Sequence, residues 1–154
     1  MTVELIPVDP SALPAWVEAQ RIEYVRARMT AGDDLHAAER NARESHERYF
    51  PQGRPAPGHE VFRVVAEGVP VGVLWVGPHP NDLEGVAWVW DVEIDEPFRG
   101  RGYGRAAMLA AESWAVGTGY RALALNVFGH NTVARGLYES LGFETTAVQL
   151  RKEL

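Results

Sequence analysis

The residues with the clearest chemical potential are three glycines, spaced two apart just before an alanine-rich segment, in Arg99-Gly100-Arg101-Gly102-Tyr103-Gly104-Arg105. Glycine can adopt positive φ angles and lets backbone N–H groups approach a ligand closely. The segment before this turn alternates like a strand, and the segment after it favours a helix. The first N–H groups of a helix are unpaired and lie at the positive end of its dipole, so such a turn binds anions. With three arginines added, the stretch predicts a phosphate or pyrophosphate ligand.

Two common phosphate-binding motifs do not fit this turn. A Walker loop ends in Gly-Lys followed by Ser or Thr, which the turn lacks. The dinucleotide-binding fingerprint has two residues before its last glycine, whereas only Tyr103 separates Gly102 from Gly104. The pattern present is Arg99-x-x-Gly102-x-Gly104, followed downstream by a second motif over residues 131–143. Together the two motifs resemble the GNAT superfamily of acetyl-coenzyme A-dependent N-acetyltransferases, and the resemblance covers residues 86–143 closely.

The periodicity of apolar residues predicts the elements that position this turn. The predicted strands are residues 3–6, 59–66, 69–76, 86–95, 122–127 and 143–151, and the predicted helices are residues 13–29, 35–50, 104–116 and 132–141. Glu67-Gly68 is a hairpin signal, so residues 59–95 read as an antiparallel meander. A right-handed crossover through residues 104–116 makes the strands on either side of it parallel. We therefore expect one α/β domain over residues 1–154, with a mixed sheet flanked by about four helices.

Composition and charge exclude several classes of function. The chain has 154 residues, no cysteine and a formal net charge of −6. The charge argues against nucleic-acid binding, the lack of cysteine excludes a thiol nucleophile, and no apolar run is long enough to cross a bilayer. The N-terminus has no signal-like segment, so we expect a cytoplasmic protein without a membrane partner. The spacing of His36 and His46 matches no usual metal site, so we expect no metal, and we expect His59 and His130 to be solvated.

The resemblance implies a cofactor and a set of residues that hold it. In this family acetyl-coenzyme A places its pyrophosphate on the glycine-rich turn and its pantetheine arm in a gap where the preceding strand splays from the next. Val92 N–H would then point at the thioester oxygen, as an oxyanion-type donor. The positions that match the cofactor site are Val92, Ile94, Arg99, Gly100, Arg101, Gly102, Tyr103, Gly104, Arg105 and Asn131.

The same resemblance implies an acid but leaves the base open. Tyr138 lies seven residues after Asn131 and matches the family phenol that donates a proton to the departing thiolate. Relatives carry a base at positions that are Trp88, Trp90 or Asn126 here, so none of those routes exists. Asp91 and Glu93 remain, on the strand face opposite the tryptophans unless a bulge turns one of them toward the cleft. Of the two we favour Glu93, acting through water.

The acceptor side of the site carries less information in its sequence. Trp90 is the predicted wall of an acceptor pocket, and His79 lies in a loop that could line its mouth. We expect transfer to a primary amine of a small molecule, peptide or protein, by direct attack because no cysteine can form an acyl-enzyme. The alternative is a coenzyme A-binding sensor or partner module without transfer activity. Many relatives dimerise, so a homodimer is expected by analogy.

Overall fold

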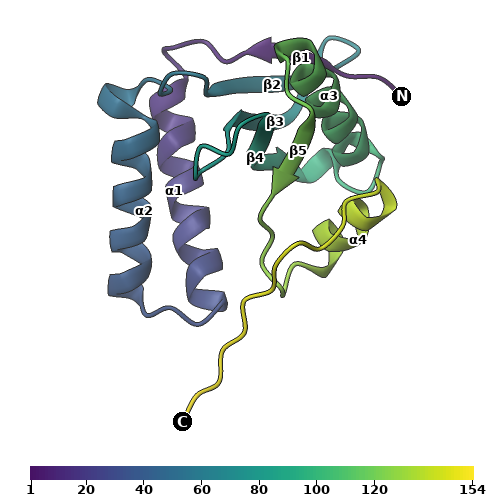
Figure 1. The fold of residues 1–154 in the computed structure, drawn as a ribbon. Coiled ribbons are helices and arrows are strands. Elements are labelled where there is room, and N and C mark those ends of the chain that lie inside the picture. The colour runs from purple at the N-terminus through teal and green to yellow at the C-terminus, as the bar shows by residue number, and fades with distance from the viewer.

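The computed structural model describes all of residues 1–154 and contains a five-stranded sheet with helices on both faces (Figure 1). The strands follow the order β1-β2-β3-β4-β5, with β1 to β4 antiparallel to their neighbours and β5 parallel to β4. The strands are β1 (Glu4–Pro7), β2 (Glu60–Ala66), β3 (Val69–Pro78), β4 (Val86–Ile94) and β5 (Ala122–Leu125), and the helices are α1 (Leu13–Thr30), α2 (Leu35–Tyr49), α3 (Tyr103–Thr118) and α4 (Thr132–Ser140). The predicted mixed α/β sheet, with its meander and parallel pair, is confirmed.

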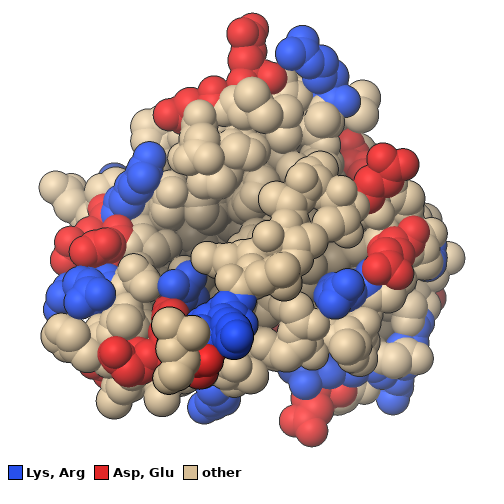
Figure 2. Space-filling model, turned by 60° about the horizontal axis from the view of Figure 1, so that its bottom comes forward, with Lys and Arg blue, Asp and Glu red and all other residues tan.

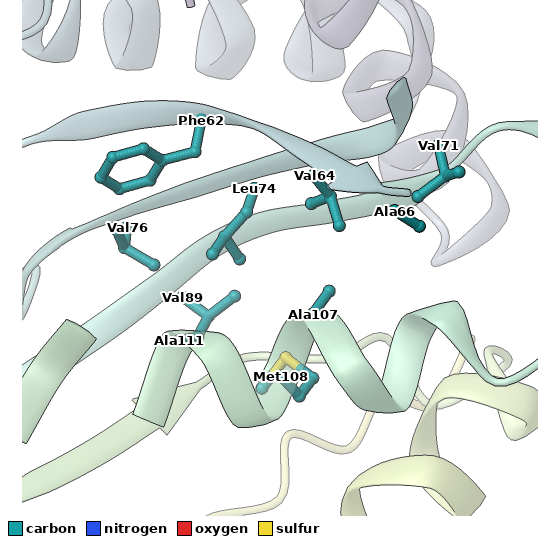
Figure 3. Packing of buried hydrophobic residues seen from close by; sticks show 10 residues of the cluster. All are labelled: Phe62, Val64, Ala66, Val71, Leu74, Val76, Val89, Ala107, Met108 and Ala111. Atoms are coloured by element: carbon teal, nitrogen blue, oxygen red, sulfur yellow. The ribbon is translucent and has the colours of Figure 1, made fainter. Parts of the chain in front are cut away.

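Each face of the sheet has its own helices and its own apolar cluster. α3 packs on one face, where Leu74 and Val89 meet Met108 (Figure 3). α1 and α2 cover the other face, where Trp75 packs with Phe50. Successive residues of a strand point to opposite faces, so Leu74 and Trp75 belong to different clusters. None of the helices is both long and apolar enough to cross a membrane.

α1 and α2 form a closely packed helical hairpin. Ala38 and Ala42 are completely buried, because their small side chains let the helix approach its neighbours. The Oδ1 atom of Asp34 accepts a hydrogen bond of 2.8 Å from the Ala37 N–H and caps α2. This hairpin frames one side of the candidate site.

The parallel pair of strands separates part way along its length. Pairing between β4 and β5 begins at Val86 and Ala122 and ends at Val89 and Leu125. β4 continues to Ile94, whereas β5 ends at Leu125, shorter than the predicted strand over residues 122–127. The backbone groups of β4 beyond Val89 therefore have no strand partner on the β5 side.

The predicted sixth strand, residues 143–151, is wrong. The chain after α4 is extended but pairs with no strand and runs away from the sheet toward the C-terminus (Figure 1). Residues 143–147 and β5 both line a groove of about 680 Å³, so the tail stands off from the free edge of β5. Farther along, the Arg151 guanidinium donates a hydrogen bond to the Gly32 carbonyl oxygen after α1. Alternation of apolar residues marks a segment that can form a strand, but a strand also needs a backbone partner.

Candidate active site

An extra residue in β4 rearranges the strand beside the point where β5 departs. Trp75 pairs with Asp91 and Val76 pairs with Val89, so Trp90 is the inserted residue of a β-bulge. Directly paired residues share a face, and Trp75 lies on the face covered by α1 and α2. The bulge therefore brings Asp91 to the same face as Trp90. Simple alternation puts the two on opposite faces, and the inserted residue is the reason for the difference.

Asp91 occupies an environment that disfavours its charge. Although part of its surface still meets solvent, protein surrounds the carboxyl group, and this burial raises its pKa to about 7. The nearby negative charge of Glu93 raises the pKa further, and the Val92 backbone N–H offsets part of the rise. A carboxyl group with this pKa can accept and release a proton near neutral pH.

Tyr138 of α4 lies near enough to Asp91 for the charge of the carboxylate to act on the phenol. Burial raises the pKa of the Tyr138 phenol, and the charge of Asp91 raises it further. The phenol therefore keeps its proton at neutral pH. The structure thus brings together a carboxylate from β4 and a phenol from α4, at the level where pairing between β4 and β5 has ended.

Glu93 has a different environment from Asp91. Its side chain is 48% exposed and lies 3.5 Å from the Nη2 atom of Arg99. Arg99 also donates a hydrogen bond of 2.8 Å from Nε to the Ile94 carbonyl oxygen. These contacts tie the end of β4 to the start of the glycine-rich turn, so Glu93 helps hold the turn in place.

The glycine-rich turn has the conformation expected of an anion site at two of its three glycines. Gly100 and Gly102 have φ angles of +72° and +89°. Gly102 is the N-cap of α3, and no side chain caps the helix or places an acidic group in its first turn. The first N–H groups of α3 are therefore free to bind a negatively charged group.

Gly104 and Arg105 act differently from their neighbours in the turn. Gly104 has helical backbone angles, and the predicted positive φ is wrong there because α3 has already begun at Tyr103. A Cβ atom on Gly104 would lie 3.4 Å from the Cδ2 atom of Leu137, so this glycine lets α4 approach α3. Arg105 donates a hydrogen bond to the Ser140 hydroxyl at the end of α4. Arg101 is exposed.

Asn131, the remaining cofactor candidate, begins α4. Its Oδ1 atom accepts a hydrogen bond of 3.2 Å from the Ala134 N–H, which is the capping role that its position in the sequence also suggests. The side-chain NH₂ group makes no bond to the protein and can still donate to a ligand.

Trp90 lies in an aromatic cluster between the sheet and the helical hairpin. Its ring stacks on Trp75 at 5.2 Å between centroids and contacts Tyr49 at 4.2 Å. The indole Nε1 donates a hydrogen bond of 3.2 Å to the Pro78 carbonyl oxygen, which fixes the ring. Trp90 also lines a pocket of about 320 Å³ between α1 and α2. The other predicted acceptor residue, His79, packs edge-on against Trp88 outside this pocket.

His59, which the sequence places beside a loop and in solvent, belongs to the same cluster. Its Nδ1 atom accepts a hydrogen bond of 3.1 Å from the Trp75 indole, and burial lowers its pKa to about 4. It is therefore neutral at pH 7, and its Nε2 atom carries the proton. A Cβ atom on Gly77 would lie 2.7 Å from Nδ1 of His59, so that glycine makes room for the ring. No short sequence motif links these two residues, which come together only through the pairing of β2 and β3.

The hollow of the molecule opens on the face seen in Figure 2. Mostly uncharged atoms line it there, and Lys, Arg, Asp and Glu side chains gather around its rim. Tyr138 lines the groove of about 680 Å³ beside β5. A recess lined by a titratable group has the features of an active site rather than of a packed core.

Comparison with known proteins agrees with this interpretation. The model of the acetyltransferase (GNAT) family matches residues 15–143. The chain is 31% identical to YycN, an uncharacterized N-acetyltransferase of Bacillus subtilis (strain 168), over the full length of both chains. It is 30% identical to a second such protein of that organism, YdgE, over 72% of this chain and 71% of the other.

Solved structures show the same fold. The crystal structure of YycN from Bacillus subtilis matches with a TM-score of 0.90 over 99% of each chain. The aminoglycoside N-acetyltransferase AAC(6′)-Iy, solved in complex with coenzyme A, matches with a TM-score of 0.60 at 20% identity, over 99% of this chain and 94% of the other. At that identity the likeness is one of fold. The chain therefore belongs to the GNAT acetyltransferase family and is an acyltransferase.

Proposed function

We propose that this acyltransferase moves an acetyl group from acetyl-coenzyme A to a primary amine, by direct attack of the amine on the thioester. The observation that carries the proposal is the presence of Asp91, whose pKa is about 7, within reach of the charge-sensitive Tyr138 phenol, which stays protonated. Amine acetylation needs a proton acceptor for the incoming amine and a proton donor for the departing sulfur.

The residues of the turn fit a coenzyme A pyrophosphate. Gly100 and Gly102 have the backbone angles that such a turn needs, and the first N–H groups of α3 have no side-chain cap. Arg99 and Arg101 add positive charge beside them, and the coenzyme A complex of AAC(6′)-Iy supports this use of the fold. In our proposal Tyr103, Gly104 and Arg105 complete the turn at the start of α3.

The gap between the two parallel strands fits the rest of the cofactor. β4 beyond Val89 has no partner on the β5 side, so its backbone groups are available to a pantetheine arm. In this arrangement Val92 N–H, shared with the neighbouring Asp91 carboxyl, polarises the thioester carbonyl. Ile94 lies along the arm, and the Asn131 amide donates to it.

Each proton in the reaction then has a donor and an acceptor. The unperturbed pKa is about 10.4 for a lysine-type ammonium group and about 8 for an α-ammonium group, so either is mostly protonated at neutral pH, and Asp91 takes its first proton. The amine nitrogen attacks the carbonyl carbon, the C–S bond breaks, and the thiolate takes the phenolic proton of Tyr138. The second proton, lost from the new amide nitrogen, restores the phenol. We assign the base to Asp91 rather than Glu93 because Glu93 pairs with Arg99 and is 48% exposed.

The proposal is tested by measuring thiol release from acetyl-coenzyme A with a panel of primary amines, with mass spectrometry of the acetylated products. We expect saturable, amine-dependent release and an acetyl group on the amine nitrogen. The alternative is a coenzyme A-binding module without transfer activity. Tight calorimetric binding of acetyl-coenzyme A without release for any amine would favour that alternative, and no binding at all would contradict both.

A further inference from the structure

A polar stripe of α2 lines a pocket that this helix shares with α1. Its members recur at helical spacing, and all of them line the pocket of about 320 Å³ between α1 and α2: Asn41, Glu44, Ser45, Arg48 and Tyr49. A helix face that looks toward a neighbouring helix and a sheet is normally apolar. Asn41, Ser45 and Tyr49 of this stripe are only half-buried, and Glu44 and Arg48 are exposed, so their polar groups can meet a ligand that enters the pocket from solvent.

The polar groups of this stripe are not used within the protein. The side-chain hydrogen bonds of α2 are those of its cap Asp34 and of His46. No ion pair includes Glu44 or Arg48, and the Arg48 guanidinium lies 5.4 Å from the centre of the Tyr49 ring. On the α1 side the pocket is lined by Arg28, which is already paired with Asp33 at 2.6 Å. Arg48 is therefore the cation of the pocket that has no anionic partner.

We propose that the acceptor amine carries a carboxylate group, which Arg48 binds. This inference rests on the proposed function and names its substrate class: an amino acid or a short peptide with a free α-amine. Arg binds planar carboxylates through charge-assisted hydrogen bonds. Glu44 lies one helical turn from Arg48 and repels a doubly charged phosphate more strongly than a single carboxylate.

The remaining walls of the pocket fit the other parts of such a molecule. Trp90 and Tyr49, 4.2 Å apart between ring centres, present an aromatic surface to an apolar side chain. Trp90 directly precedes Asp91 in the bulge, so an amine bound against this wall is near the proposed base. A volume of about 320 Å³ is at the small end for ligand pockets and suits a single amino acid. An acceptor with several positive charges would instead meet two arginines and one carboxylate.

The test compares two amines that differ in one group, phenylalanine and 2-phenylethylamine, with spermidine as a polycationic probe. For the unmodified enzyme we expect kcat/KM to favour phenylalanine over 2-phenylethylamine by at least about 10-fold. In Arg48→Met the KM for phenylalanine should rise about 10- to 100-fold with kcat nearly unchanged. The values for 2-phenylethylamine should not move. Arg43→Met, on an exposed part of α2 outside the pocket, is the matched control and should behave like the unmodified enzyme.

A binding measurement keeps the two proposals separate. N-acetylphenylalanine and N-acetyl-2-phenylethylamine are titrated into the coenzyme A complex of the unmodified protein and of Arg48→Met. Tighter binding of the carboxylate compound that is lost in the variant supports the inference even where no transfer occurs, and absent transfer would then count against the proposed function alone. Equal binding of both compounds, or a preference for 2-phenylethylamine or spermidine in the assay, would overturn the inference.

Discussion

The two sides of the candidate site use different kinds of contact. On the cofactor side the proposed contacts come from the backbone: the turn at Gly100 and Gly102, the N-terminus of α3 and the unpaired edge of β4. On the acceptor side they come from side chains that lie far apart in the sequence, such as Arg48 of α2 and Trp90 of β4. A backbone contact can form whichever side chain the residue carries, whereas a side-chain contact depends on the residue type. The cofactor can therefore be predicted from a local sequence motif, and the acceptor cannot.

The largest effect should come from Asp91, where the acceptor side meets the chemistry. We expect Asp91→Asn to lower kcat about 10²- to 10⁴-fold, because the amide cannot accept the ammonium proton. Acetyl-coenzyme A affinity, measured by calorimetry, should not change. Glu93→Gln is the control for charge on the same strand and should lower kcat only a few-fold. Equal losses in both variants would contradict the assignment of the base.

On the cofactor side, a large loss of acetyl-coenzyme A affinity should require a change in the backbone. Gly102→Trp places a side chain where φ is +89°, and we expect acetyl-coenzyme A affinity to fall about 100-fold as N–H contacts are lost. Gly117→Trp, at the far end of α3 with open space around it, is the matched control. Arg101→Ala should weaken binding much less than Gly102→Trp. The opposite order in calorimetric titrations would mean that side-chain charge, not the backbone, holds the cofactor.

Tyr138→Phe should have a smaller effect than Asp91→Asn. The variant keeps the ring but loses the proton for the thiolate, so kcat should fall about 10- to 100-fold with little change in KM. Thiol release and amide formation are measured separately in this variant. An unchanged rate of both would show that solvent protonates the sulfur and that Tyr138 is a packing residue.

The smallest effect concerns stability and distinguishes Asp91 from an ordinary surface carboxylate. Its pKa rises from 3.8 to about 7 on folding, so the folded state holds the proton more tightly than the unfolded state does. The contribution of Asp91 to the free energy of unfolding therefore falls as pH rises from about 4 to about 7. Asp91→Asn should raise the Tm by about 3 °C or more at pH 8 and change it little at pH 4. Calorimetry that shows no gain at pH 8 would contradict the raised pKa.

Much of the fold could be predicted because local patterns determine it. Residues 86–118 contain a strand, a proline, a glycine turn and an alanine-rich helix, and each signal depends only on near neighbours. The prediction of a last strand was wrong because residues 143–151 have the right alternation of apolar residues but no backbone partner beside β5. The helical backbone of Gly104 and its contact with Leu137 depend on how closely α4 approaches α3, which no local signal carries.

The site was less predictable than the fold. The residue types at Asp91 and Glu93 both suit a base, and simple alternation cannot place a bulge. The inserted Trp90 appears only when β3 and β4 are paired, and this pairing puts Asp91 and Glu93 on one face. Only the surrounding chain then encloses Asp91 and leaves Glu93 exposed. His59 joins the cluster through its contact with Trp75, 16 residues away, for which the sequence carries no signal. The catalytic roles of Asp91 and Tyr138 stay predictions until they are measured.

The most direct test of the central claim is the pH dependence of kcat/KM for the acceptor amine, measured for the unmodified enzyme and for Asp91→Asn. With Asp91 as the base, kcat/KM should rise with pH up to an apparent pKa near 7, because the carboxyl must lose its proton before it can accept one. Asp91→Asn should lose that acid limb and keep only the rise due to the amine itself. An acid limb near pH 7 that persists in Asp91→Asn would show that another group accepts the proton.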